Sequence, residues 1–229
     1  GSISLRIYTP ETKQEGLLPV LLYFHGGGWL YSGIEAVDRA VRLIANEAQV
    51  IVISVEYRLA PEWPWPAAND DGETAFLWAR ANARSFGGDP ESVAVGGDSA
   101  GGNISMSISQ RQIAAGRPTP LYQLLYYTAI DFSPHYESSK LFAQGYSLDM
   151  TFRDFMMSVV YPNPGMAERA VKEIKSVKME KMPASIVVTA GFDMLRDPGQ
   201  SLARRMEKAG TAVTYLNYPT LIHGFLQWS

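Results

Sequence analysis

Residues 50–55 read Val50-Ile51-Val52-Ile53-Ser54-Val55, an almost unbroken apolar run. A strand with one face in water alternates apolar and polar side chains, whereas a strand covered on both faces does not need to alternate. This run therefore indicates a strand inside a parallel sheet that has helices on both faces. Other apolar runs alternate with helix-compatible stretches along the chain, which predicts an α/β fold with right-handed crossover connections.

The alternation also places the individual elements. The predicted strands are Ile3–Tyr8, Val20–Phe24, Val50–Val55, Ser92–Val95, Leu121–Tyr127, Ser185–Ala190 and Ala212–Tyr218. The predicted helices are Ala36–Ala48, Ala68–Ser85, Ala100–Ala115 and Pro198–Ala209. Residues 133–182 break this rhythm and are rich in aromatic residues and methionines; they form either a cap-like insertion over a site or a segment packed on the main core. The chain as a whole, residues 1–229, is interpreted as a single domain.

A short motif follows one of the predicted strands. Gly97-Asp98-Ser99-Ala100-Gly101 comes directly after an apolar run and directly before a predicted helix. G-x-S-x-G in that context is typical of a nucleophile elbow, a sharp turn that exposes a serine hydroxyl. The glycines are needed because neighbouring backbone comes too close for a Cβ. Ser99 is thus a candidate nucleophile, although such a motif alone also fits a glycine-rich turn with an uninvolved serine. Asp98 is interpreted as structural.

A second glycine-rich loop follows the strand Val20–Phe24 and reads His25-Gly26-Gly27-Gly28-Trp29. Glycines leave backbone N–H groups open, and such a loop offers donors to an oxyanion in lipases and esterases. A phosphate-binding loop is disfavoured because neither a Gly-Lys-Ser/Thr ending nor G-x-G-x-x-G spacing is present. His25 is expected to brace this loop.

Two aspartates follow the strand Ser185–Ala190 and compete for the role of catalytic acid. Asp197 precedes Pro198 and a predicted helix, so it is predicted to be the N-cap residue of that helix. Asp193 lies just past the carboxyl end of the strand and has no such structural task. Asp193 is therefore the preferred acid.

His223 is the preferred general base among the three histidines of the chain. His135 lies in a turn-rich stretch and is expected to be solvated. His223 follows the last predicted strand, and by itself it fits an ordinary loop histidine. The order Ser99, Asp193, His223 is the order expected of α/β-hydrolases. Because ligands bind at the carboxyl ends of strands in such sheets, these residues are expected to meet at one edge.

With these motifs, the chain resembles the bacterial hormone-sensitive-lipase-like esterases of the α/β-hydrolase superfamily. The matching segments are His25–Trp29, Tyr57–Glu62, Gly97–Gly102, Asp193–Asp197 and His223–Phe225. The resemblance implies hydrolysis of carboxylic esters with short or medium acyl chains, through an acyl-enzyme on Ser99 and without a cofactor or metal. It also implies an oxyanion hole made by Gly27, Gly28 and Ala100. A homodimer formed through edge strands is a further implication.

The resemblance leaves some alternatives open. Members of the family carry a helical cap ahead of the first strand, which is expected to be reduced or missing in this chain. Arylformamidase-like amide hydrolases share similar loop and elbow motifs. A non-catalytic ligand-binding homologue, as in the plant gibberellin receptors, is a third reading; those receptors lack the catalytic histidine, whereas His223 is in place here.

Composition excludes several other classes. The net charge of −3 provides no basic stripe, so nucleic acid is not an expected partner. The absence of cysteine excludes disulfides, thiolate metal sites and cysteine nucleophiles. No apolar run approaches the ~18 residues of a membrane span. Because no signal peptide is visible, a cytoplasmic location is predicted.

Overall fold

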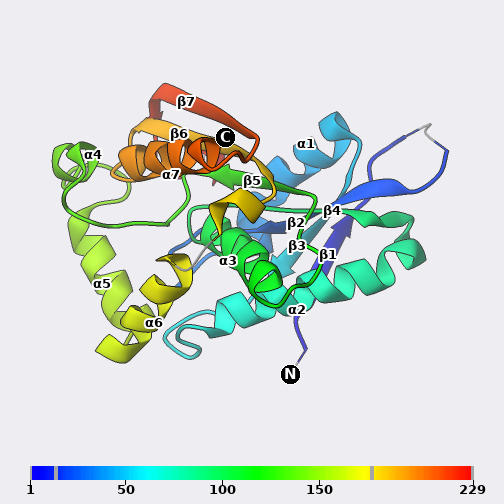
Figure 1. Cartoon of the computed structure of the whole chain (residues 1–229), viewed down its shortest axis with the longest axis horizontal. Helices are drawn as coiled ribbons and strands as arrows, with labels where there is room; N and C mark the ends of the chain where they lie inside the picture. Colours follow the sequence, from blue (N-terminus) through cyan, green and yellow to red (C-terminus); the bar gives the residue numbers. More distant parts are fainter. Residues whose placement is uncertain (1, 13–14, 176–177, 228–229) are drawn as a thin grey trace.

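The computed structural model describes residues 2–12, 15–175 and 178–227. Its centre is a seven-stranded sheet with the order β1-β3-β2-β4-β5-β6-β7 (Figure 1). The strands are β1 (Ser4–Tyr8), β2 (Leu18–Phe24), β3 (Ile51–Glu56), β4 (Gly88–Asp98), β5 (Tyr122–Tyr126), β6 (Ala184–Phe192) and β7 (Val213–Ile222). β1 pairs antiparallel with β3, and the other neighbouring pairs are parallel.

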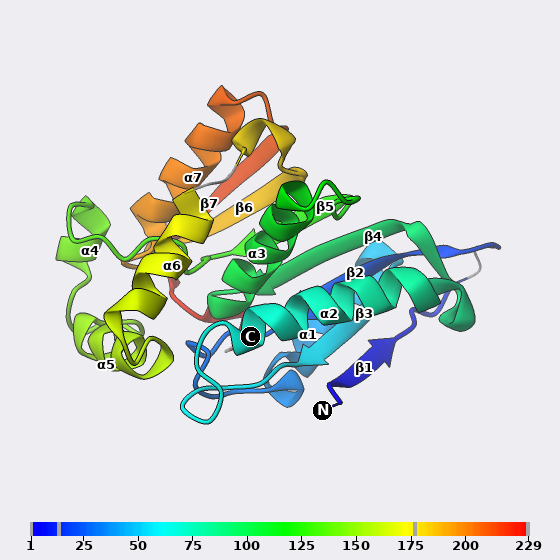
Figure 2. The same ribbon diagram turned by 60° about the horizontal axis from the view of Figure 1, so that its bottom comes forward.

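Helices lie on both faces of this sheet and at one end of the molecule. They are α1 (Asp38–Ala48), α2 (Ala67–Asn82), α3 (Ala100–Ala114), α4 (Glu137–Leu141), α5 (Met150–Val160), α6 (Pro164–Lys175) and α7 (Arg196–Lys208). Short 3₁₀ turns are η1 (Ile34–Val37), η2 (Ala83–Phe86), η3 (Met179–Lys181) and η4 (Phe225–Gln227). Figure 2 shows α2, α3 and α7 on one face of the sheet, with α1 on the other. The predicted α/β fold is confirmed.

Strand β2 shows why the apolar runs do not alternate. Leu21 and Tyr23 pack toward α1 with Val41, while Leu22 and Phe24 belong to the larger core on the opposite face. All of these side chains are buried. Both faces of the central strands therefore need apolar residues, as a parallel sheet between two helical layers requires.

Each predicted strand is present, but some bounds differ. β4 begins at Gly88 rather than Ser92, and its early part contains Pro90. β7 continues past Tyr218 through Pro219 to Ile222. Proline removes a ladder donor and masks a strand in the sequence pattern, yet an edge strand such as β7 tolerates it.

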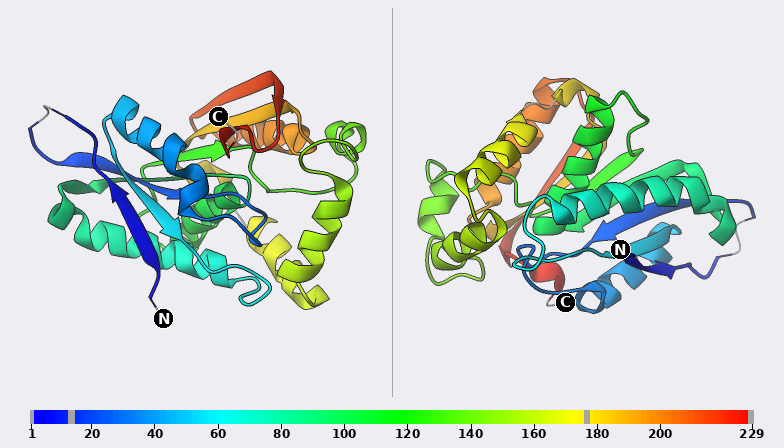
Figure 3. Two further views of the ribbon diagram at one scale, coloured as in Figure 1. Left: turned by 180° about the vertical axis from the view of Figure 1, so that it is seen from behind. Right: turned by 90° about the horizontal axis from the view of Figure 1, so that it is seen from below.

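Residues 133–182 contain α4, α5, α6 and η3, and the helices α4, α5 and α6 lie at one end of the molecule (Figure 3). Residues 176–177 of this stretch lie outside the described residues. Leu148, Met156 and Val160 are buried in the main core cluster. The segment thus packs on the core through part of its apolar side chains.

Among the described residues, no helix is both long and apolar enough to cross a membrane.

Candidate active site

Ser99 occupies the sharp turn between β4 and α3. Its backbone has φ 53° and ψ −115°, a conformation that residues with a side chain rarely adopt. A Cβ at Gly97 or Gly101 would overlap the carbonyl group of Phe24 on the neighbouring strand β2. The two glycines of the motif are therefore required by the close approach of backbone, as a nucleophile elbow needs.

Backbone hydrogen bonds hold this turn on both sides. The Ser99 N–H donates to the Tyr126 carbonyl at the end of β5 (2.9 Å), and the Ser99 carbonyl accepts from Ala129 N–H (3.0 Å). Because β5 is the neighbouring strand, the strained residue is anchored by the sheet. These contacts fix the backbone from which the Ser99 side chain projects.

Three side chains distant in the sequence meet at this edge of the sheet. His223 Nε2 lies 2.9 Å from Ser99 Oγ, and His223 Nδ1 lies 2.7 Å from Asp193 Oδ2. The other carboxylate oxygen of Asp193 accepts a hydrogen bond from the Leu195 N–H (2.8 Å). With a carboxylate beside Nδ1, that nitrogen carries the proton and Nε2 is free to accept one. All three residues are buried, Ser99 and His223 at 8% exposure.

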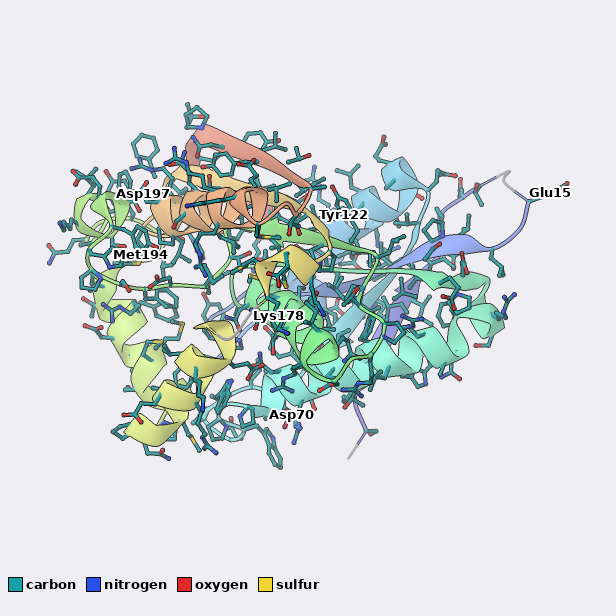
Figure 4. All side chains as sticks on the ribbon, in the orientation of Figure 1. Glu15, Asp70, Tyr122, Lys178, Met194 and Asp197 are labelled. Carbon is teal, nitrogen blue, oxygen red and sulfur yellow. The ribbon has the colours of Figure 1, made fainter. Side chains whose placement is uncertain are left out.

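Asp197 takes a different position from the one the sequence predicts. Helix α7 begins at Arg196 and its N-cap residue is Leu195, so Asp197 lies inside the first turn and the N-cap prediction is wrong. The carboxylate of Asp197 instead accepts hydrogen bonds from the Ser138 N–H (2.8 Å) and from Arg196 Nε (2.8 Å). Because Ser138 belongs to α4, the Asp197 carboxylate links α4 to α7. Figure 4 labels Asp197 beside α7.

Partial burial raises the pKa of Asp197, but the hydrogen bonds from Arg196 and Ser138 outweigh this effect. The pKa of Asp197 is therefore lowered from its usual value, and the carboxylate is ionised at neutral pH. Asp197 has a structural task and does not contact His223.

The glycine loop lies beside Ser99. Gly27 and Gly28 have φ of 117° and 62°, in the region that favours glycine. A Cβ at Gly27 would overlap the Tyr31 carbonyl, and one at Gly28 would lie 2.8 Å from Met156 Sδ. The Gly27 carbonyl accepts from Leu30 and Tyr31 N–H groups, whereas no described residue accepts from the N–H groups of Gly27 and Gly28.

Ala100 is the first residue of α3 and is fully buried. An N–H group in the first turn of a helix has no partner within the helix and carries a partial positive charge. The three predicted oxyanion donors thus come from a glycine loop and a helix N-terminus on either side of Ser99.

The other two histidines lie away from the Ser99 hydroxyl. His25 is fully buried, stacks on the Tyr57 ring at 4.2 Å and has its Nδ1 2.7 Å from the Gly26 carbonyl. Burial lowers the pKa of His25, so it is neutral and braces the loop. His135 is exposed, as expected.

A cavity of about 60 Å³ opens onto Ser99, His223 and the two loop glycines. Other residues that line the cavity share an aromatic or apolar side chain: Tyr31, Tyr127, Phe132, Leu148, Phe152 and Met156. Phe152 and Met156 belong to the aromatic- and methionine-rich stretch 133–182, for which the sequence leaves a cap over the site open. No motif marks the other four residues.

Tyr127 contacts one of the reacting side chains directly. Its ring contacts the His223 ring edge-on at 4.8 Å, and its hydroxyl accepts from Leu226 N–H (3.3 Å). Burial raises the pKa of Tyr127 far above its usual value, so the hydroxyl stays neutral. Tyr127 therefore supports the turn that carries His223.

The sequence and the fold of the chain are similar to those of known hydrolases. Residues 21–227 match a protein family described by the alpha/beta hydrolase fold. The chain is 37% identical to the carboxylic ester hydrolase LipN of Mycobacterium tuberculosis, over 99% of this chain and 61% of LipN. It is also 37% identical to the carboxylesterase NlhH of the same organism, over 99% of this chain and 72% of NlhH. The chain thus spans less than two thirds of the length of LipN.

Solved structures give the same picture. EstE1, a thermophilic and thermostable carboxylesterase cloned from a metagenomic library, matches 100% of this chain and 78% of its own, with a TM-score of 0.93 and 32% identity. An ester hydrolase from the metagenome of Lake Arreo, in complex with a derivative of bipyridine phosphonate, is 42% identical with a TM-score of 0.93. That match covers 98% of this chain and 72% of the Lake Arreo chain.

Proposed function

This chain belongs to the α/β-hydrolase family, and from that premise we propose that it is a serine hydrolase for carboxylic esters with short to medium acyl chains. The proposal rests above all on His223, whose ring nitrogens lie 2.9 Å from Ser99 Oγ and 2.7 Å from Asp193 Oδ2. A hydroxyl, an imidazole and a carboxylate in this order form the arrangement that activates serine for acyl transfer.

The first half of the proposed reaction acylates Ser99. As Ser99 Oγ attacks the ester carbonyl carbon, its proton passes to His223 Nε2. The carbonyl π electrons move to oxygen, and the N–H groups of Gly27, Gly28 and Ala100 stabilise that oxyanion. When the carbonyl re-forms, the bond to the alkoxide breaks and His223 returns the proton to the leaving alcohol. Asp193 holds the imidazole tautomer and stabilises the imidazolium.

The second half releases the acid. A water molecule takes the place of the alcohol, His223 accepts its proton, and the oxygen attacks the acyl carbon. The tetrahedral species then collapses with Ser99 Oγ as the leaving group, and His223 gives the proton back to Ser99. No step of this sequence uses a cofactor, and the substrate is a small-molecule ester.

We also propose that residues 133–182 act as a cap-like insertion within a single domain of residues 1–229. Leu148, Phe152 and Met156 line the cavity above Ser99, and Met156 Sδ approaches the Gly28 backbone. These side chains would exclude water from the acyl group and limit its size. A homodimer through an edge strand and a cytoplasmic location stay predictions from the sequence.

The test is hydrolysis of p-nitrophenyl esters from acetate to laurate by the wild type and by Ser99→Ala. We expect Ser99→Ala to reduce kcat by ~10³-fold or more, whereas Ser85→Ala, an exposed serine on η2, should leave kcat unchanged. Wild-type activity in Ser99→Ala would rule out the acyl-enzyme.

A second measurement identifies the nucleophile and the bond that is cleaved. An organophosphate should add its mass to the peptide that contains Ser99, and labelling at another residue would contradict the assignment. Faster turnover of an aryl formamide than of p-nitrophenyl acetate would favour the amide hydrolase. If the wild type hydrolyses neither the ester nor the formamide but still binds a ligand, the non-catalytic homologue would be favoured.

A further inference from the structure

Asp98 precedes the nucleophile and is fully buried. Its carboxylate accepts hydrogen bonds from separate segments of the chain. Oδ1 accepts from the Tyr23 hydroxyl (3.1 Å) and from the Gly26 N–H (3.0 Å), while Oδ2 accepts from Gln227 Nε2 (2.9 Å) and the Tyr127 hydroxyl (3.4 Å). One side chain thus connects β2, the glycine loop, the end of β5 and the turn after His223.

These hydrogen bonds link Asp98 to residues next to the proposed oxyanion hole and to the general base. Gly26 opens the loop that contains two oxyanion donors. Tyr127 contacts the His223 ring, and Gln227 closes the turn that follows His223. A Cβ at Gly26 would collide with Asp98 Oδ2 and would lie 2.9 Å from Gln227 Nε2. The first glycine of the loop is therefore needed to make room for this carboxylate.

The contacts also determine the charge of Asp98. The Gly26 N–H can only donate, and the Gln227 amide presents its NH₂ group, so the two donors approach different carboxylate oxygens. A proton on either oxygen would compete with one of these donors, so the surroundings fit the ionised carboxylate. Burial raises the pKa of Asp98 above its usual value, and the hydrogen bonds from Tyr23, Gly26 and Gln227 limit that rise without cancelling it.

We propose that Asp98 is a positioning residue whose ionised carboxylate aligns the oxyanion loop and the His223 turn with Ser99 and favours the protonated imidazole. It touches no substrate atom in this role, and the inference rests on the proposed ester hydrolysis. Because the carboxylate is buried, its attraction for an imidazolium is screened less than it would be in water.

Among the described residues, the titratable groups that interact with this carboxylate or contact His223 contribute no competing cation. They are Tyr23, Tyr31, Tyr57, Tyr126, Tyr127 and Asp193. Burial raises the pKa of each of these tyrosines, so they are neutral near pH 7. Asp193 contacts His223 directly, and the charge of Asp98 interacts with His223 through space.

The test compares Asp98→Asn with the wild type on p-nitrophenyl butyrate. Asparagine keeps the size but removes the charge, and its amide group opposes one of the N–H donors. We expect kcat to fall by ~10²-fold with KM changed less than about threefold, because misaligned groups lose transition-state contacts rather than binding. The acid limb of kcat/KM should move to lower pH, because loss of a nearby negative charge disfavours the charged imidazolium.

A matched control separates this effect from general destabilisation. Glu73 on α2 also accepts from several side chains, namely Arg111, Gln112 and Arg117. These partners lie in the last turn of α3 and beyond it, far from Ser99. Glu73→Gln should lower the melting temperature without moving the acid limb.

Histidine NMR provides a readout that needs no turnover. The chain has three histidines, so the imidazole signals can be assigned by substitution in the resting protein. We expect the His223 signals to move in Asp98→Asn and to stay in place in Glu73→Gln, because, of the two residues, only Asp98 is linked to the His223 turn. Unmoved His223 signals together with wild-type kcat in Asp98→Asn overturn the inference. An ester-inactive wild type would instead refute the proposed function.

If Asp98→Asn does not fold, Gln227→Met carries the test. This change removes one donor to Asp98 and keeps the carboxylate. We expect kcat to fall about tenfold with an unchanged acid limb, because alignment is weakened and the charge remains. A kcat equal to that of the wild type would contradict the positioning role.

Discussion

The nucleophile elbow and the covering segment of residues 133–182 are held in place in different ways. At the elbow, Gly97 and Gly101 meet the backbone of β2 with no room for a Cβ, and Ser99 is strained and anchored by β5. This segment, which we propose covers the site, contacts the cavity through side chains such as Phe152 and Met156, and methionine adapts its conformation to its surroundings. We therefore expect the backbone to hold the proposed nucleophile in place and the side chains of residues 133–182 to limit access to it.

The largest expected effect is at the elbow. Gly101→Ala places a Cβ against the Phe24 carbonyl, and both groups belong to backbone that cannot move independently. We expect a loss of more than ~3 kcal/mol in the free energy of unfolding, measured by urea denaturation, and no esterase activity. Gly165 on α6 is the matched position in residues 133–182, where an added Cβ makes only an ordinary van der Waals contact. Gly165→Ala should be neutral or slightly stabilising. Equal losses of stability at both positions would contradict the proposed difference between the two regions.

The two aspartates after β6 sharpen the same contrast. Asp193→Asn leaves the His223 tautomer without its acceptor and should reduce kcat by ~10³ to 10⁴-fold, by analogy with other triads. Asp197→Asn weakens the link between α4 and α7 and should change kcat less than about threefold. Steady-state kinetics of both variants decide the matter, and the reverse ranking would assign the acid to Asp197.

Asp197→Asn should act on stability and its pH dependence instead. Because the pKa of Asp197 is lowered in the folded state, its contribution is present above the unfolded pKa and disappears as pH falls through the folded value. The melting temperatures of the wild type and the variant should therefore differ at neutral pH and converge in acid. A constant difference down to pH 2 would speak against this carboxylate as the source.

The contrast also explains how much the sequence could predict. The strand runs and the elbow are local patterns, so their positions follow from residues close in the chain. The order Ser99, Asp193, His223 identifies residues that the sheet then brings together. Helix α7 begins at Arg196 rather than at the predicted Pro198, and Asp197 accepts a hydrogen bond from Ser138, a residue distant in sequence. Local residues do not reveal that contact. Asp98, likewise, gains its partners only when four segments meet.

The cavity lining shows the same limit. Met156 is a methionine on an amphipathic helix, a pattern that also fits ordinary core packing, and it does join the core cluster. Its approach to Gly28 depends on how α5 is placed against the glycine loop. No spacing within α5 encodes that contact, so its role in the site required the three-dimensional structure.

Met156→Ala should have an intermediate effect. Removing the side chain enlarges the cavity beside Gly28, so we expect the preferred ester to shift toward longer acyl chains, read from kcat/KM for acetate through laurate. Burial at 2% exposure predicts a stability loss of about 2–5 kcal/mol. Met157→Ala, partly buried on the same helix and absent from the cavity lining, is the control. An unshifted profile would show that α5 does not limit the acyl group.

The smallest expected effect concerns the polar contact between α6 and α3. Glu173 Oε1 accepts from Arg111 Nε (3.0 Å) and from the Ser107 hydroxyl (2.7 Å), and its side chain is 25% exposed. Glu173→Gln keeps an oxygen acceptor and removes the charge, while Arg111 retains Asp70 and Glu73. We expect a loss below about 1 kcal/mol in the free energy of unfolding that shrinks at high salt, because partly exposed ion pairs are screened.

The control is Glu168→Gln, exposed on the same helix, which should show neither a loss of stability nor a salt dependence. A loss of several kcal/mol for Glu173→Gln would mean that the covering segment depends on this charge rather than on apolar packing.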